Sequence, residues 1–176
     1  MGRLDGKVAV GDGAGGGLGR AHAMLLAAEG AKVVVNDLGG ARDGTGASTS
    51  MADGVVDEIV ANGGEAIAHY GSVTSREDAQ GMVDAAVSQY GKIDILIANA
   101  GILRDKSFKN MTDDMWDVVM DVHLRGTYLT TKVAFDQMLE QGTGGRIIMT
   151  SSNTGLQGHI GQTNCGAGKA GIAGNM

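Results

Sequence analysis

The chain has 176 residues, 43% of them hydrophobic, and a formal net charge of −6 at pH 7. This length fits one domain, and the apolar content is sufficient for a buried core. The acidic balance, without any Lys/Arg cluster, argues against a nucleic acid as partner. No apolar run is long enough to cross a membrane, and a single cysteine excludes an internal disulfide. No secretory leader opens the chain, so we expect a cytoplasmic protein.

A glycine-rich stretch, GDGAGGGLG (residues 11–19), directly follows a short apolar segment. Glycine permits positive φ and a close approach of a ligand to the backbone. Between a strand and a helix N-terminus, such a turn presents free N–H groups to a pyrophosphate. Its spacing, Gly13-x-x-x-Gly17-x-Gly19, is weak by itself because the chain has 31 glycines, so a plain tight turn remains an alternative.

The predicted elements alternate between strand and helix along the chain. Strands are expected at residues 7–10, 31–36, 65–70, 93–98 and 146–150. Helices are expected at residues 18–29, 50–62, 74–90, 112–141 and from 162 onward. This alternation predicts an α/β fold, a doubly wound, Rossmann-like parallel sheet covered on both faces. We expect residues 1–176 to form a single dinucleotide-binding domain.

The periodicity of the first helix also predicts which of its faces is buried. Apolar and small side chains recur there every three or four residues. The predicted core stripe consists of Leu18, Ala21, Met24, Leu25 and Ala28.

Asp37 ends the second strand, 18 residues after Gly19. A dinucleotide-binding fold places here the acid that hydrogen-bonds the adenosine ribose hydroxyls, which favours NAD over NADP. Gly13, Gly17, Gly19 and Asp37 together therefore indicate dinucleotide binding. The polar, glycine-rich segment 39–49 that follows is interpreted as a mobile surface insertion.

Motifs at the ends of the later strands complete a recognisable set. They are Asn99-Ala100-Gly101, Ser152 and Lys169. Residue 165 lies thirteen positions after Ser152, and Lys169 lies four positions after residue 165. In this combination the chain resembles the short-chain dehydrogenase/reductase family over its whole length. Finer strings resemble the (3R)-hydroxyacyl-CoA dehydrogenase units of type 2 multifunctional enzymes and their bacterial relatives. These strings are VNDLGG (35–40), GILRD (101–105), VHLRG (122–126) and GQTN (161–164).

The resemblance implies roles for the matching residues. In that family a tyrosine takes the proton of the substrate hydroxyl while hydride passes to the nicotinamide. Ser152 would bind the substrate oxygen, and Lys169 would lower the pKa of the tyrosine and hold the nicotinamide ribose. His123 stands where the family has an active-site asparagine, although a structural histidine satisfied within the fold remains an alternative. The implied NAD-binding residues are Gly13, Gly17, Leu18, Gly19, Asp37, Asn99, Gly101 and Lys169. No metal site is predicted.

Four positions depart from the family pattern. Cys165 occupies the place of the catalytic tyrosine, and a thiol is a shorter and weaker hydrogen-bond donor than a phenol. Lys169 would tend to convert this thiol into a thiolate, although a small buried apolar role is an equal alternative. Asp12 replaces a threonine and would place a second anion beside a pyrophosphate. Gly11 replaces a β-branched residue, and Gly71 replaces an aspartate that would bind the adenine amine.

Relative to that family, the sheet is expected to be incomplete at its C-terminal side, which leaves the fifth strand as an exposed edge. The candidate catalytic residues are Ser152, Cys165, Lys169 and His123. We expect an oxidoreductase that transfers hydride between NAD(H) and a secondary alcohol or ketone, such as a 3-hydroxyacyl thioester, with weak or no turnover. The alternatives are a non-catalytic NAD-binding or subunit-pairing remnant, and a fragment without function. The family also implies a homo-oligomer with a small-molecule substrate, without nucleic-acid or membrane partners.

Overall fold

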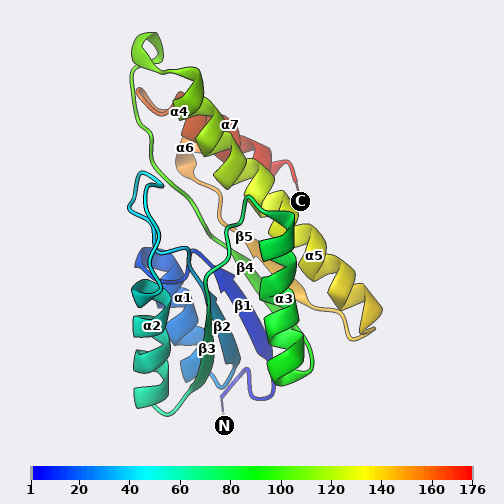
Figure 1. The fold of residues 1–176 in the computed structure, drawn as a ribbon. Helices are drawn as coiled ribbons and strands as arrows, with labels where there is room; N and C mark the ends of the chain where they lie inside the picture. Colours follow the sequence, from blue (N-terminus) through cyan, green and yellow to red (C-terminus); the bar gives the residue numbers. More distant parts are fainter. Residues whose placement is uncertain (1, 176) are drawn as a thin grey trace.

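A five-stranded parallel sheet forms the centre of the molecule (Figure 1). The computed structural model describes residues 2–175. The strands are β1 (Val8–Asp12), β2 (Lys32–Asn36), β3 (Glu65–His69), β4 (Ile95–Ala98) and β5 (Arg146–Met149). They pair in the order β3-β2-β1-β4-β5. The predicted doubly wound α/β fold is confirmed.

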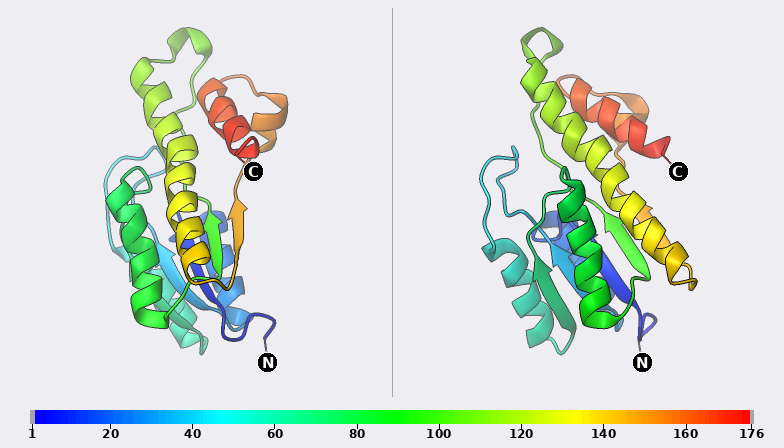
Figure 2. Two further views of the ribbon diagram at one scale, coloured as in Figure 1. Left: turned by 90° about the vertical axis from the view of Figure 1, so that its right-hand side faces the viewer. Right: turned by 45° about the vertical axis from the view of Figure 1, so that its right-hand side comes forward.

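Helices cover both faces of this sheet (Figure 2). On one face lie α1 (Gly17–Ala28) and α2 (Ser50–Ala61), and on the other lie α3 (Arg76–Tyr90) and α5 (Thr127–Glu140). The remaining helical elements are η1 (Phe108–Asn110), α4 (Asp113–Met120), the π-helical turn η2 (Asp121–Gly126), α6 (Asn153–Gln157) and α7 (Thr163–Ala173). The predicted long helix is thus α4, η2 and α5 in direct succession, with a π turn inside it.

The register of the sheet brings polar side chains together at one end. Asp12, the last residue of β1, pairs with Asn36 of β2, and Asn36 pairs with His69 of β3. β1 is buried along its whole length, because it lies in the middle of the sheet and is covered on both faces. The carboxyl ends of parallel strands share one edge of the sheet, so residues that follow them form a common surface.

The predicted buried stripe of α1 is wrong. Leu18 is 66% exposed and Leu25 is 62% exposed. The buried residues of this helix are Gly19, Ala23 and Ala27. A Cβ atom on Gly19 would lie 2.0 Å from the carbonyl oxygen of Gly13, so the helix starts in direct contact with the loop before it. Only small residues fit at such a distance. Of the predicted stripe, Met24 alone is partly buried against the core, where Leu26 also packs.

The segment interpreted as a mobile insertion forms a closed loop, called here the 38–48 loop. Ser48 N–H donates to Leu38 O at 3.0 Å, and Ala41 N–H donates to Thr45 O at 2.8 Å. The loop, cyan in Figure 1, rises beside the segment that follows β4. Backbone hydrogen bonds thus close the loop at the surface, and its mobility stays a prediction.

β5 lies at one edge of the described sheet, as expected (Figure 2). Ile148 of this strand is 52% exposed. Within residues 2–175, no helix combines the length and the apolar character that crossing a bilayer requires.

Candidate functional site

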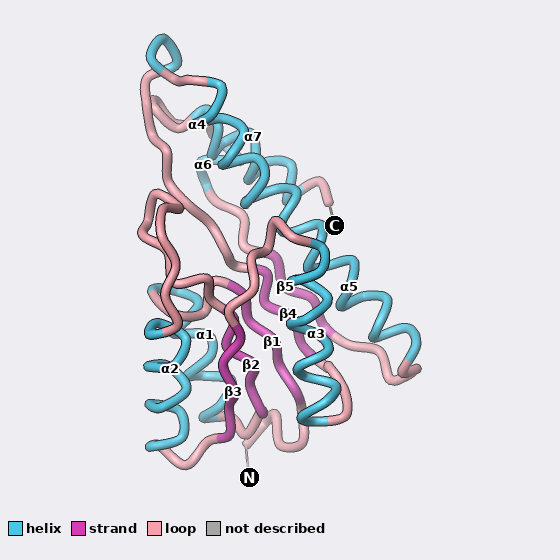
Figure 3. Tube along the Cα trace, in the orientation of Figure 1, coloured by secondary structure: helices cyan, strands magenta, loops and turns pink. Residues whose placement is uncertain are grey.

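Loops gather beyond the carboxyl ends of the strands (Figure 3). Residues of these loops contribute to the linings of two adjoining clefts. The larger one, of about 440 Å³, is lined by the glycine-rich stretch, the end of β2 and the segments after β3 and β4. We call it the glycine-loop cleft. The smaller one, of about 310 Å³, is called the Ser152 cleft. Its lining includes His123, Thr150, Ser151, Ser152, Cys165 and Lys169.

The glycine-rich stretch takes the conformation for which glycine is needed. Gly13 has φ +57° and Gly17 has φ +51°. A Cβ atom on Gly13 would lie 2.7 Å from Ala100 Cα, whereas one on Gly17 would meet no heavy atom within 4 Å. Gly13 and Gly17 line the glycine-loop cleft, but Leu18 and Gly19 line neither cleft. Of the predicted cofactor residues, Gly19 therefore has a packing role, and the Leu18 side chain points away.

Asp37 connects the end of β2 to the glycine-rich stretch. Its Oδ2 accepts the N–H of Gly15 at 2.8 Å, and its Oδ1 accepts the N–H of Gly39 at 2.7 Å. The residue also lines the glycine-loop cleft. Because each carboxylate oxygen can accept more than one hydrogen bond, Asp37 retains capacity for ligand hydroxyl groups.

Asp12 does not lie where the sequence placed it, beside a pyrophosphate. Its side chain is 2% exposed and lines neither cleft. One oxygen, Oδ1, accepts the N–H groups of Asn99 at 2.7 Å and Ala100 at 2.6 Å. Burial raises the pKa of Asp12, and these two backbone hydrogen bonds oppose the shift. The carboxylate thus fixes the segment after β4, which corrects the expected repulsion.

The side chain of Asn99 extends this network across the sheet. Its Nδ2 donates to Gly13 O at 3.1 Å, and its Oδ1 accepts from Thr150 Oγ1 at 3.4 Å. Asn99 and Gly101 both line the glycine-loop cleft, as predicted for cofactor-binding residues. The ends of β1, β4 and β5 are therefore joined through one amide.

Lys169 reaches from α7 to the end of β5. Its Nζ donates to Thr150 O at 2.7 Å, and its backbone carbonyl accepts from Ser151 Oγ at 2.7 Å. Burial lowers the pKa of Lys169, while Cys165 and Asp12 oppose this shift. One hydrogen bond thus holds the ammonium group at the wall of the Ser152 cleft, and the other fixes the backbone of Lys169.

Ser152 lies at the N-terminus of α6, a short helix that sequence reasoning missed. Its Oγ accepts the N–H of Thr154 at 3.2 Å and donates to Asn153 Oδ1 at 3.2 Å. The hydroxyl caps the helix and lines the same cleft as Lys169. The structure therefore brings these two predicted residues together.

Cys165 lies in α7, one turn before Lys169, and is 7% exposed. Burial raises the pKa of its thiol, and this outweighs the opposite effect of Lys169. Asp105 raises the pKa further. The predicted thiolate is therefore wrong, because desolvation disfavours the charged sulfur more than one nearby ammonium stabilises it. The alternative interpretation, a small buried apolar residue, agrees better with the burial of Cys165 and the raised pKa of its thiol.

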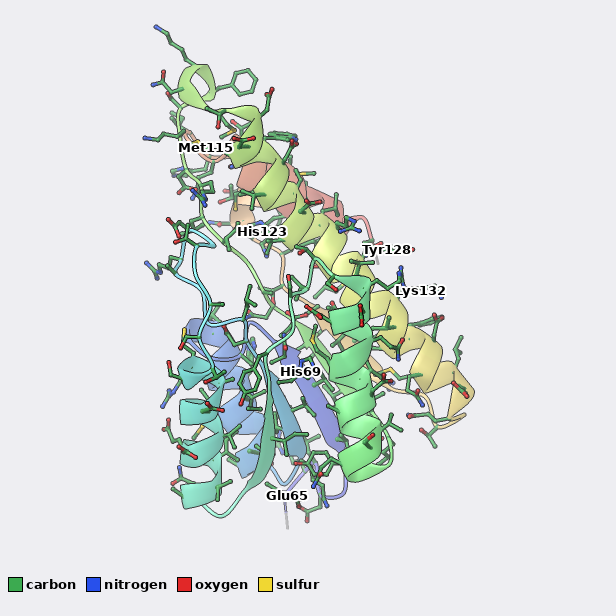
Figure 4. The ribbon with its side chains drawn as sticks, in the orientation of Figure 1. Glu65, His69, Met115, His123, Tyr128 and Lys132 are labelled. Carbon is green, nitrogen blue, oxygen red and sulfur yellow. The ribbon has the colours of Figure 1, made fainter. Side chains whose placement is uncertain are left out.

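His123 lies in the π turn η2 and faces the segment after β4 (Figure 4). Its Nε2 lies 2.9 Å from Ile102 O and 3.0 Å from Ile102 N. Cβ atoms on Gly101 or Gly168 would each lie 3.1 Å from this side chain. The residue is 2% exposed, and burial lowers its pKa from 6.5 to about 4. His123 therefore lines the Ser152 cleft as a neutral imidazole that holds the peptide of Ile102.

Asn36 is a site residue that sequence reasoning missed. Its Oδ1 accepts the N–H of Gly71 at 2.9 Å, and its Nδ2 donates to Gly71 O at 3.1 Å. His69, labelled at the end of β3 in Figure 4, lies 2.8 Å from the same Oδ1. A Cβ atom on Gly71 would lie 2.7 Å from His69 Cε1. The His69 ring therefore occupies the space that a side chain at position 71 would need.

Asn164 was also missed as a residue that positions the site. It is completely buried, and its Nδ2 donates to Arg104 O at 3.1 Å and to Met115 O at 3.0 Å. Met115 is labelled on α4 in Figure 4. Asn164 thus ties α7, which carries Cys165 and Lys169, to the segments on either side. Its place in the GQTN string (161–164), directly before Cys165, was the available signal. The part of the chain that the structure describes holds no group of three or more side chains suited to a metal ion.

Comparisons with known proteins agree with this architecture. A family model described as short chain dehydrogenase matches residues 7–176. Peroxisomal multifunctional enzyme type 2 of Drosophila melanogaster is 52% identical over 172 residues, which are 98% of this chain and 28% of that protein. Hydroxyacyl-CoA dehydrogenase ChsB1 of Mycobacterium tuberculosis is 45% identical over 180 residues, 96% of this chain and 54% of that protein.

A solved structure gives the same result. The crystal structure of a short chain dehydrogenase from Mycobacterium avium matches with a TM-score of 0.91 and 48% identity, over 99% of this chain and 62% of that one. The chain therefore spans less than two thirds of each of these three proteins. By its sequence and by its fold, the chain belongs to the short-chain dehydrogenase family.

Proposed function

We propose that the chain binds NAD(H) and represents the cofactor-binding part of an oxidoreductase that interconverts a secondary alcohol and a ketone. The observation that carries this proposal is the junction of the two clefts, which share Arg42, Gly101 and Ile102 in their linings. One cleft offers glycine backbone and Asp37, and the other offers Ser152 and Lys169. One extended ligand that lies across the junction would meet both sets of groups.

The glycine-loop cleft suits the adenosine and pyrophosphate parts of a dinucleotide. Gly17 leaves open space beside the first turn of α1, where free N–H groups attract a pyrophosphate. Asp37 can accept hydrogen bonds from ribose hydroxyl groups, whereas a ribose 2′-phosphate would be repelled by its charge. These properties favour NAD over NADP. When bound, the nicotinamide supplies the hydride acceptor or donor.

The Ser152 cleft suits the reacting end of the substrate. The Ser152 hydroxyl can donate to a carbonyl or alcohol oxygen, and Lys169 supplies a positive field beside it. Cys165 would have to move the substrate proton, but it carries a neutral thiol that is too short for this role. A positioned acid or base typically contributes about 10²–10⁴-fold in rate, so turnover by this chain is expected to be weak or absent.

The substrate class is proposed from the relatives. Two of them carry the names hydroxyacyl-CoA dehydrogenase and 3-oxoacyl-[acyl-carrier-protein] reductase. A 3-hydroxyacyl thioester has the secondary alcohol that Ser152 and Lys169 would orient, so we propose this class of substrate. A homo-oligomeric state and a cytoplasmic location remain predictions.

The test is a fluorescence titration with NADH and NADPH, followed by an assay of 3-hydroxybutyryl-CoA oxidation. We expect NADH to bind more tightly than NADPH, and Asp37→Asn to reduce this preference. Equal or tighter NADPH binding would contradict the proposed cofactor, and failure to bind either would overturn the proposed function.

A non-catalytic dinucleotide-binding protein is the second candidate. The neutral, buried thiol of Cys165 at the tyrosine position favours it. NADH binding without any thioester oxidation would support this candidate, whereas measurable oxidation would exclude it.

A further inference from the structure

Arg42 lies where the two clefts meet. It belongs to the 38–48 loop, and together with Gly101 and Ile102 it lines both clefts. Of these three residues, only Arg42 carries a charge. A ligand that extends from one cleft to the other would therefore pass Arg42.

The backbone of Arg42 is held across the junction. Its carbonyl oxygen accepts the N–H of Leu103, in the segment after β4, at 2.9 Å. Gly44, in the same loop, has φ +83°, and a Cβ atom there would lie 3.0 Å from Ile102 Cδ1. The loop thus packs against the segment that divides the clefts, which fixes where the Arg42 side chain begins.

The guanidinium group itself is unused. Within residues 2–175 it makes no hydrogen bond or ion pair with another side chain, and Arg42 is exposed. Asp43, the acid next to it, accepts both the N–H and the hydroxyl of Thr45. Lys169, the other lysine or arginine in the cleft linings, donates to a backbone carbonyl. Arg42 is therefore the cation that these clefts keep available for a ligand.

We infer that Arg42 binds the pyrophosphate of a dinucleotide that lies across both clefts. This inference rests on the proposed function. A dinucleotide with its adenosine ribose at Asp37 and its nicotinamide near Lys169 carries its pyrophosphate between these ends, at the junction. The pyrophosphate is the only anionic group of NAD, and a guanidinium group binds phosphate oxygens in a bidentate manner. Arg42 faces this anion from the 38–48 loop, opposite the backbone N–H groups of the glycine-rich stretch.

The test compares Arg42→Gln with Arg146→Gln, which removes the same charge at the start of β5, the opposite end of the sheet. Binding of NADH, ADP-ribose and adenosine is measured for both variants and for the unaltered chain. We expect Arg42→Gln to weaken NADH and ADP-ribose by about tenfold or more and to leave adenosine unchanged. Arg146→Gln should change none of the three affinities. Arg42→Lys, which keeps the charge, should recover part of the loss.

The outcomes separate this inference from the proposed function. Equal NADH affinity of the unaltered chain and Arg42→Gln would overturn the inference and leave NADH binding intact. No NADH binding by the unaltered chain would overturn both. NADPH and coenzyme A are titrated as two further ligands, and a loss confined to either of them would assign Arg42 to a ribose phosphate or to the acyl carrier and overturn the inference. A parallel loss of adenosine binding, or Arg42→Lys behaving like Arg42→Gln, would show a structural effect and overturn it too.

Discussion

Asp12 Oδ1 accepts the backbone N–H of Asn99 at 2.7 Å, and the same oxygen accepts that of Ala100 at 2.6 Å. A single side chain at the end of β1 therefore fixes the segment that lines both clefts. The threonine of the family pattern could accept hydrogen bonds at the same place. The Asp12 carboxylate therefore takes over the role of that hydroxyl as acceptor and does not place a negative charge in the cleft.

Replacement of Asp12 tests this assignment. Asp12→Ala should lower the free energy of unfolding by about 2 kcal/mol, because it leaves two partly buried N–H groups without their acceptor. Asp12→Thr should lose less, since its hydroxyl can still accept, and should leave NADH affinity unchanged. Urea unfolding and an NADH titration measure the two effects. Equal stability of the alanine and threonine variants would contradict the role of the acceptor.

His123 predicts a specific pH dependence of stability. Its pKa in the folded chain is about 4, below the usual 6.5, so the neutral ring stabilises the fold fully above pH 6.5. This contribution is lost as the pH falls toward 4, by up to about 1.4 kcal/mol per pH unit. The unfolding free energy of the unaltered chain should therefore fall more steeply over this range than that of His123→Gln.

The control for this series is the exposed His159. His159→Gln makes the same replacement at an exposed position and serves as the matched variant. A His123→Gln profile parallel to that of the unaltered chain from pH 7 to pH 4.5 would show that the buried imidazole is not the group that titrates.

Two glycines in helices should respond in opposite directions to alanine. Gly54 lies inside α2, where a Cβ atom would meet nothing within 4 Å, so Gly54→Ala should stabilise the chain by about 0.5–1 kcal/mol. Gly19→Ala would place Cβ 2.0 Å from Gly13 O and should cost about 2 kcal/mol or more. It should also weaken NADH binding, because the loop must move. Thermal unfolding distinguishes the variants, and a tolerated Gly19→Ala would refute the close contact.

Cys165 predicts a change in activity. In a chain extended by the remaining segment of the Mycobacterium avium relative, Cys165→Tyr should raise 3-hydroxyacyl-CoA oxidation by at least about a hundredfold over the same extended chain with cysteine. We expect Cys165→Tyr without the extension to stay near background, because the chain spans 62% of that relative. Comparable rates for the two extended forms would show that this position does not carry the proton.

The order of strands and helices could be predicted because its signals are local. Glycines close the helices, and β-branched runs such as residues 33–35 mark buried strands. The buried face of α1 could not be predicted, since it depends on how closely Gly19 approaches Gly13. The direction of the Asp12 side chain also escaped prediction, because it is set by Asn99, about 87 residues away in sequence. The raised pKa of Cys165 escaped prediction too, because its main cause is burial in the folded chain.

The π turn η2 changes how the long helix can be altered. An α-helix turns about 100° per residue, so the extra residue of a π turn rotates everything before it relative to everything after it. Here α4 and η2 contact α7, whereas α5 contacts α3 and the sheet. Deletion of one residue within 121–126 would restore regular helical geometry but rotate α4 away from α7. Substitutions on this helix can therefore be tolerated where a single deletion cannot, because the number of residues in η2 sets which face of α4 is turned toward α7.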